Sequence, residues 1–361
     1  MTGVSRVVVA AFAALSVTAA ASAEVPRRRI PPAPWHAVES WSVGGSGSTA
    51  PLRLRDGRVV VFTRGPSTVV VVDGVRGAVR SNALEARPSE EPAPWSDAHG
   101  RVAVRCETTL YRVGTDGRVR ATAALAAGDL AGVVPRSDGT EVAVVRASDH
   151  VDFAALRADG TVAAVRSLAG SSTTEAVGFG RDEVIIGVPR GLAVFDVAGA
   201  VRVLPSVDGV THLARAGDAV FAVTEHAMHR IGDDGALGPP LPLPAPTRGW
   251  TTAPDGTALA WIDGPQPTLL RVRPDGSIAA RFAAPPFVES LDTDDAGTMV
   301  LATRRGRIVA LEADGRTRWV VDLQRPIVTS LALGDGDAWV ATADGALLHL
   351  APAAETDDAH R

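Results

Sequence analysis

Short apolar runs, separated by polar turns, follow one another along almost the whole chain. In residues 297–323 the runs 299–303, 307–312 and 317–321 are mostly apolar, and Arg304-Arg305-Gly306 and Asp314-Gly315 separate them. Apolar and β-branched runs joined by Asp-Gly indicate β-hairpins, because Gly accepts the positive φ that tight turns require. Residues 297–323 therefore predict three consecutive antiparallel strands.

This pattern repeats along the chain. The glycines of the turn that opens the last strand of each unit are 43, 43, 39, 36, 41 and 39 residues apart. They are Gly74, Gly117, Gly160, Gly199, Gly235, Gly276 and Gly315. A four-stranded unit of this length is typical of one β-propeller blade, and strands that are apolar on both sides indicate sheets covered on both faces.

Counting the units predicts an all-β, eight-bladed β-propeller with four-stranded antiparallel blades. Seven blades is the alternative, if residues 180–200 or 216–236 do not form a full blade. The last unit has only three predicted strands, at 329–333, 338–342 and 346–350, while a spare strand lies at 35–43. We expect this N-terminal strand to complete the last blade, because open strand edges invite aggregation.

The N-terminus predicts the compartment. Arg6 precedes the apolar run 7–17, and Ala21-Ser22-Ala23 supplies a cleavage site, which indicates a signal peptide at 1–23. An uncleaved anchor is the alternative, but the run is shorter than the ~20 residues that a membrane span needs. We expect a soluble chain, periplasmic or secreted, with no later transmembrane segment. Its parts are a Pro/Arg-rich tether at 24–34 that does not pack, a propeller at 35–351 and a disordered tail at 352–361.

Composition narrows the function classes. All 36 basic residues are Arg, they are scattered among 41 acidic residues, and the net charge is −5. Nucleic-acid binding needs a basic stripe, so we expect none. Cys106 is the only cysteine and cannot form an internal disulfide, so the fold must rest on packing.

One segment resembles a known family. Residues 306–319 (GRIVALEADGRTRW) are similar to the repeat of PQQ-like propeller proteins, in which a strand ending in Ala-Leu-Asp or Ala-Leu-Glu precedes a Gly turn and a Trp. Residues 110–120, 153–162 and 269–278 keep the strand and the Asp-Gly pair but lack the Trp. The resemblance implies a propeller fold, as in quinoprotein dehydrogenases and BamB-like outer-membrane assembly scaffolds. The dehydrogenases have longer chains, a Ca²⁺ site and often adjacent cysteines, so we expect no PQQ and no other cofactor here.

Other candidate chemistry is weak. His226 and His229 are three residues apart but have no nearby third ligand, and His99 and His150 lie in or beside turns. Asp292, Asp294 and Asp295 lack the distal Glu of a calcium loop and are better explained by turn formation. We therefore predict no catalytic, cofactor-binding or metal-binding residue.

The remaining candidates are on the surface. In a propeller the turns between second and third strands share a face with the connections between blades, and loops on a rigid scaffold often bind partners. Two such connections stand out, the acidic 81–94 and the Pro-rich 237–246. The candidate interaction residues are Arg64, Arg190, Arg304, Arg305, Glu85, Glu90 and Glu91.

Two functional hypotheses remain open. The first is an exported, monomeric, non-catalytic scaffold that binds a protein or peptide partner through these loops. The alternative is a hydrolase-like or lyase-like enzyme, in which residues from several blades converge on the central channel.

Overall fold

The structure is a computed structural model that describes residues 29–43, 51–54, 56–63, 68–73, 78–83, 93–96, 102–106, 108–114, 118–157, 159–189, 191–205, 209–262 and 264–352. Within these ranges all regular secondary structure is β-strand, and no helix there is long and apolar enough to cross a membrane. The signal peptide expected at 1–23 and residues 353–361 of the expected tail lie outside the described residues.

The described strands form eight four-stranded sheets, which we number as blades. Blade 1 comprises β2 (Leu52–Arg53), β3 (Val59–Thr63), β4 (Thr68–Asp73) and β5 (Ala78–Ala83). Blade 2 comprises β6 (Ala93–Ser96), β7 (Val102–Cys106), β8 (Thr109–Val113) and β9 (Val119–Ala124). Blade 3 comprises β10 (Asp129–Pro135), β11 (Glu141–Arg146), β12 (His150–Leu156) and β13 (Val162–Ala169). Blade 4 comprises β14 (Val177–Phe179), β15 (Glu183–Val188), β16 (Gly191–Phe195) and β17 (Val201–Pro205).

The second half of the ring repeats this plan. Blade 5 comprises β18 (His212–Ala216), β19 (Ala219–Val223), β20 (Ala227–Ile231) and β21 (Leu241–Pro242). Blade 6 comprises β22 (Thr247–Thr252), β23 (Ala258–Ile262), β24 (Thr268–Val272) and β25 (Ile278–Ala283). Blade 7 comprises β26 (Val288–Thr293), β27 (Met299–Thr303), β28 (Arg307–Leu311) and β29 (Thr317–Asp322). Blade 8 comprises β30 (Ala332–Leu333), β31 (Ala338–Ala341), β32 (Ala346–Pro352) and β1 (Trp35–Ser42).

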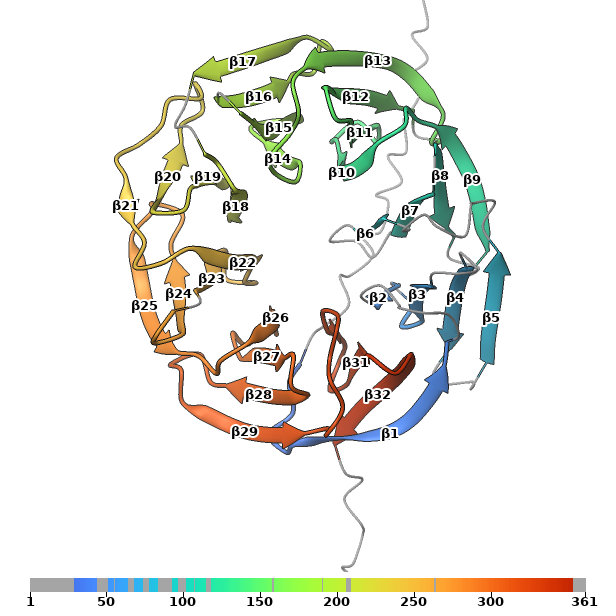
Figure 1. The fold of residues 1–361 in the computed structure, drawn as a ribbon, viewed down its shortest axis with the longest axis vertical. Helices are drawn as coiled ribbons and strands as arrows, with labels where there is room; N and C mark the ends of the chain where they lie inside the picture. The colour runs from blue at the N-terminus through green and yellow to red at the C-terminus, as the bar shows by residue number, and fades with distance from the viewer. Residues whose placement is uncertain are drawn as a thin grey trace, which may run out of the picture.

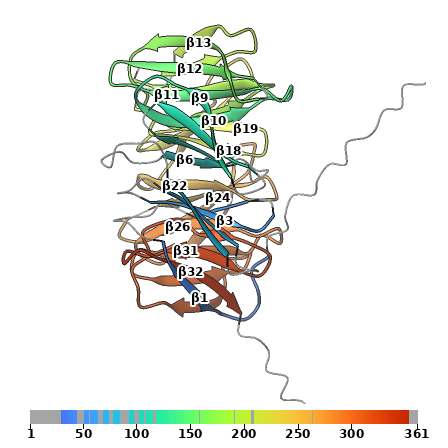
Figure 2. The ribbon, with the colours of Figure 1, turned by 90° about the vertical axis from the view of Figure 1, so that its right-hand side faces the viewer.

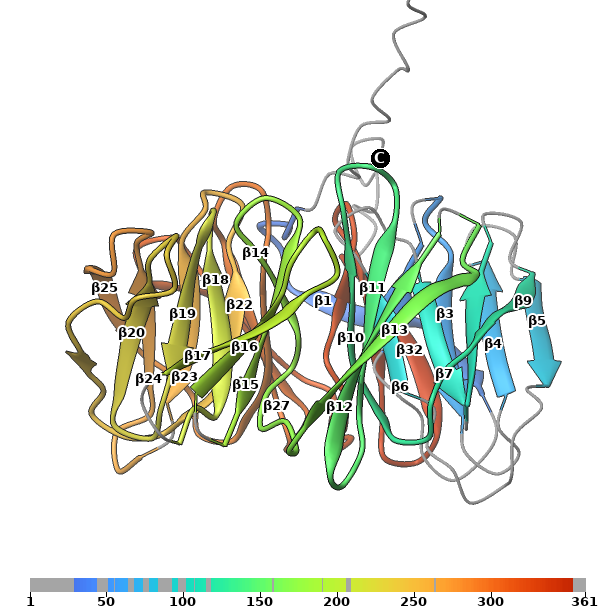
Figure 3. The same ribbon diagram turned by 90° about the horizontal axis from the view of Figure 1, so that it is seen from above.

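The blades stand around a central axis, with the first strand of each blade nearest the axis (Figure 1). Seen from the side, the ring is a flat disc whose strands run between its two faces (Figures 2 and 3). Neighbouring strands within each sheet are antiparallel, and both weak units, 180–200 and 216–236, belong to full four-stranded blades. The chain folds as an eight-bladed β-propeller, which confirms the predicted fold class.

The core is divided among the contacts between neighbouring blades. Alternate residues of one strand face opposite neighbours: Val59 and Val61 pack in the cluster shared with blade 8, whereas Val60 packs in the cluster shared with blade 2. The same alternation gives each of the eight blade-to-blade contacts an apolar cluster of its own. This explains why second and third strands such as β3, β16 and β27 are apolar at successive positions, since neighbouring blades cover both of their sides.

The N-terminal strand closes the ring as predicted. β1 pairs antiparallel with β32, so the first and last described strands lie side by side in blade 8 (Figures 1 and 2). Trp35 is 2% exposed and meets the Trp319 ring edge-on, with ring centroids 5.1 Å apart. Trp319 is the Trp of the PQQ-like segment, so this residue serves the closure of the ring.

Residues 29–34, which we call the N-terminal strap, are bound to the ring. The prediction that the tether does not pack is wrong here, because Ile30 is buried and its N–H donates to the buried Asp294 carboxylate at 2.8 Å. The carbonyl oxygen of Ile30 accepts from Arg318 at 2.6 Å, and that of Pro31 accepts from the Trp319 indole at 2.9 Å. The Pro-rich strap has few N–H groups of its own, and side chains of blade 7 satisfy its carbonyls instead.

A polar network spans the contact between blades 8 and 1. Asp337 accepts hydrogen bonds from Arg53 of β2 at 2.5 Å and interacts with His349 of β32 at 2.9 Å. The His349 ring in turn stacks on Trp339, with centroids 4.4 Å apart. Burial alone raises the pKa of Asp337, but the hydrogen bonds from His349 and Arg53 outweigh it, and the pKa lies below its ordinary value of 3.8.

We predict that Trp35→Ala destabilises the ring by about 3–5 kcal/mol, because it leaves a cavity against Trp319 and removes the indole donor to the Gly336 carbonyl. The measurement is the free energy of unfolding in urea. The control is His36→Ala on the same strand, whose exposed side chain should change this energy little. Equal losses in the two variants would contradict the closure described above.

We further predict that Asp337→Asn makes the protein less sensitive to acid. A carboxyl with a lowered folded pKa stabilises the fold above its unfolded pKa, and this stabilisation is lost as the pH falls through the folded pKa. Between about pH 5 and about pH 2 the parent should lose on the order of 1 kcal/mol more stability than the variant. Urea unfolding across this range measures the difference. Asp335→Asn is the control, and it should keep the acid sensitivity of the parent.

Candidate functional site

The face of the ring that carries the turns between second and third strands also carries the connections between blades; we call it the loop face. At blade 7 two of these segments are joined. The Arg304 N–H, in the turn between β27 and β28, donates to the Phe287 carbonyl, in the connection between β25 and β26, at 2.9 Å. This bond holds a segment of the loop face against the rigid sheet.

Phe287 and Arg305 form an exposed pair on this face. The Phe287 side chain is 50% exposed, and the Arg305 guanidinium carbon lies 4.6 Å from the centroid of its ring. This is cation–π geometry, in which the guanidinium keeps in-plane N–H donors available for a carboxylate. In the described part of the chain Arg305 forms no ion pair. We call these two residues the Phe287–Arg305 pair.

The backbone of Phe287 has φ +62°, a left-handed conformation that is unfavourable for a bulky side chain. Strain of this kind costs about 1–3 kcal/mol and is found preferentially at functional sites. Here the hydrogen bond to the Arg304 N–H and the following strand β26 hold the conformation. The ring is thereby presented outward rather than folded into the core.

The neighbouring charges are paired. Arg304 donates to the Glu289 carboxylate at 3.0 and 3.1 Å, and Arg325 lies 3.5 Å from Asp344. Of Arg304, Arg305 and Arg325, Arg305 is therefore the one whose guanidinium remains available to a ligand. An apolar ring beside an unpaired guanidinium suits a ligand with an apolar and an acidic group.

Of the candidate residues from the sequence, Arg304 and Arg305 are brought together here. The others lie outside the described residues: Arg64, Arg190, Glu85, Glu90 and Glu91. Phe287 was missed by sequence reasoning. One signal was available in the sequence. Phe287 follows Pro285-Pro286 in a connection between blades, where an aromatic side chain does not belong to the apolar side of a strand.

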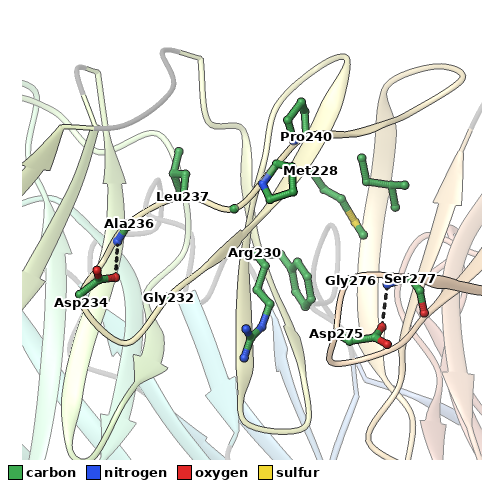
Figure 4. Close-up of a pocket in the computed structure, with 14 residues that line it drawn as sticks. Met228, Arg230, Gly232, Asp234, Ala236, Leu237, Pro240, Asp275, Gly276 and Ser277 are labelled. Carbon is green, nitrogen blue, oxygen red and sulfur yellow. Dashed lines mark hydrogen bonds between the residues drawn. The ribbon is translucent and has the colours of Figure 1, made fainter.

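The sequence predicts a connection between blades at 237–246, and this is wrong for its first part. Leu237 forms a bridge to Ile231, and β21 pairs with Ala227 and Met228, so residues 237–242 form the outer edge of blade 5. Proline is tolerated there because one side of an edge strand needs no hydrogen-bond donors. The interrupted edge leaves a cavity of about 530 Å³ between blades 5 and 6 (Figure 4).

The histidines have ordinary structural surroundings. His229 is buried on β20, and its Nδ1 lies 3.2 Å from the Gly238 carbonyl, while His226 is exposed in the preceding turn. His150 lies 2.6 Å from Asp149, whose hydrogen bond raises the pKa of the imidazole. No group of three or more His, Cys, Asp or Glu that could hold a metal ion occurs among the described residues.

The turn interpretation of 291–296 agrees with the geometry from Asp294 onward, whereas residues 291–293 belong to strand β26. Asp294 accepts from the N–H groups of Ala296 at 3.0 Å and Thr298 at 2.8 Å, and its other oxygen binds the strap. His99 lies outside the described residues, and for Cys106 only the strand is described.

Comparison with solved structures finds other propellers. The C-terminal WD40 domain of Sif2 aligns with a TM-score of 0.66 and 10% identity over 89% of this chain and 99% of that chain. The Dos1 propeller aligns with a TM-score of 0.65 and 9% identity over 88% and 95%. Virginiamycin B lyase from Staphylococcus aureus aligns with a TM-score of 0.54 and 12% identity over 88% and 99%.

These likenesses show the fold alone. No protein-family model matches the chain, and no curated protein matches it. The resemblance to PQQ-like proteins is thus confirmed at the level of the propeller fold, and no family match supports its finer form.

We predict that the backbone strain at Phe287 is measurable. Phe287→Gly should be more stable than Phe287→Ala by about 1 kcal/mol, because only Gly adopts the left-handed conformation without cost. Urea unfolding of the two variants gives the difference. At the exposed strand residue Val320 the order should reverse, with the Ala variant the more stable. The same order at both positions would show that Phe287 is not strained.

Proposed function

We propose that this chain is an exported, non-catalytic propeller that binds a protein or peptide partner through its loop face. The observation that carries the proposal is the Phe287–Arg305 pair, an exposed aromatic ring held in a strained conformation beside a guanidinium that forms no ion pair with the described residues. Aromatic residues and Arg are the residue types that most often dominate binding energy in interfaces. Export rests on the signal peptide expected at residues 1–23.

The expected partner presents an apolar residue next to an acidic one. Covering the Phe287 ring removes apolar surface from water, which is worth roughly 1.5–3 kcal/mol for a side chain that becomes fully buried. Arg305, stacked on that ring, donates to the carboxylate of the partner. Because the closed ring already holds both groups in place, little ordering cost opposes binding.

The alternative is an enzyme with its site at the central channel. The structural neighbours include both a lyase and a WD40 domain, so the choice rests on the residues of this chain. Among these the Phe287–Arg305 pair favours recognition by the loop face. The same experiment can decide between the two functions.

We predict that the chain from Glu24 onward, immobilised, captures a partner from an envelope extract, identified by mass spectrometry. The purified partner should bind the parent and should bind Phe287→Ala and Arg305→Ala at least about tenfold more weakly. Val165→Ala and Arg166→Ala, two exposed residues on the outer strand β13, are matched controls and should bind like the parent.

Two results would contradict the proposal. One is a partner that binds the two loop-face variants as tightly as the parent. The other is the absence of any reproducible partner together with turnover of a compound from a hydrolase and lyase substrate panel, which would favour the channel enzyme.

A further inference from the structure

The cavity between blades 5 and 6 has the size of a small-molecule site. Its volume of about 530 Å³ lies within the roughly 300–1,000 Å³ of ligand pockets. Leu237, Pro240 and Leu241 form a partly exposed apolar wall, whereas Phe221 and Met228 also line the cavity but are only 0% and 1% exposed.

The cavity exists because the outer strand of blade 5 is short. The outer strands of the other blades have five to eight residues, whereas β21 has two. Residues 238–240, Gly-Pro-Pro, lie between the Leu237 bridge and β21; the Gly238 N–H donates to the Arg230 carbonyl at 2.8 Å, but the two prolines have no N–H to donate. Met228 and Arg230 of β20 line the cavity beside this irregular edge.

Arg230 brings a positive charge into this apolar site. Figure 4 shows it between the turn that carries Asp234 and the turn that carries Asp275. Its side chain is exposed, and in the described part of the chain it forms no hydrogen bond or ion pair. The guanidinium is thus available to donate two parallel hydrogen bonds to a carboxylate.

The two aspartates supply negative charge at the same cavity. Asp234 accepts from the Ala236 N–H at 2.9 Å and Asp275 from the Ser277 N–H at 2.8 Å, so each uses one oxygen to close its turn. The hydrogen bonds from Ser277 hold the pKa of Asp275 below its ordinary value, which keeps this carboxyl ionised at neutral pH. One cation and two carboxylates beside an apolar wall are complementary to a ligand with both charges and an apolar body.

We propose that this cavity binds a small zwitterion with a bulky apolar group, of the class of apolar amino acids and dipeptides. The ligand carboxylate binds Arg230, its ammonium group faces Asp234 and Asp275, and its apolar side chain lies on Leu237, Pro240 and Leu241. The site is separate from the Phe287–Arg305 pair and does not depend on the function proposed for that pair.

The test is calorimetric titration of the full chain with L-leucine, L-phenylalanine and the dipeptide leucyl-phenylalanine. At least one probe should bind saturably, and its N-acetylated and its amidated form should each bind at least about tenfold more weakly, because each loses one charge-assisted contact. Absence of saturable binding by all three probes would overturn the proposal. Equal binding of the N-acetylated form would also overturn it, because the ammonium group would then have no role.

Two variants locate the site. Arg230→Gln should weaken binding at least about tenfold. Asp275→Asn should weaken it severalfold, since Asn keeps an oxygen for the Ser277 N–H but removes the charge. The matched controls are Arg166→Gln on β13 and Asp159→Asn, which occupies the equivalent turn of blade 3 and accepts from the Thr161 N–H at 2.9 Å. Parent-like binding by Arg230→Gln, or equal weakening by the controls, would place the ligand elsewhere.

Discussion

The pairing of β1 with β32 is the interaction on which the rest of the structure depends. Every blade has two apolar faces, so every blade needs two neighbours, and the ring satisfies all of them only when it is closed. The N-terminal strap adds to this closure, because Ile30 and Pro31 bind Asp294, Arg318 and Trp319 of blade 7 before the chain enters blade 8. The strap and β1 therefore tie the start of the described chain to blades 7 and 8 at its end.

Closure has a functional consequence, because it makes the loop face a rigid platform. A left-handed conformation at Phe287 persists only where its surroundings determine it, and the Arg304 N–H provides this at the end of a fixed sheet. The cavity at Arg230 has a different origin. There the outer strand is interrupted by prolines, and the polar turns of two neighbouring blades remain at its edge. The Phe287–Arg305 pair thus lies on loops outside the strands of blade 7, whereas the cavity at Arg230 lies where the outer strand of blade 5 is shortened.

Much of the fold could be predicted because its signals are local. Asp-Gly turns require positive φ, which Gly315 adopts at +86°, and their spacing counts the blades. The surfaces were harder to predict. Arg305 could be named from its turn, but Phe287 lies 18 residues away in another connection, and only the folded ring brings the two together. The sequence around Arg230 gave no signal of the cavity, because it does not show that the outer strand of blade 5 beside this residue is short.

By itself the sequence predicted the all-β class, a count of eight blades with seven as the alternative, and the strand that closes the last blade, since turn chemistry and apolar periodicity act over a few residues. Only the tertiary structure decided which side chains meet across blades. It placed the strap on blade 7, moved residues 237–242 from a connection into the edge of blade 5, and set Arg305 over Phe287. The strap contact joins residues remote in the chain and depends on how neighbouring sheets pack, whereas the edge at residues 237–242 pairs with residues 227–231 of the same blade.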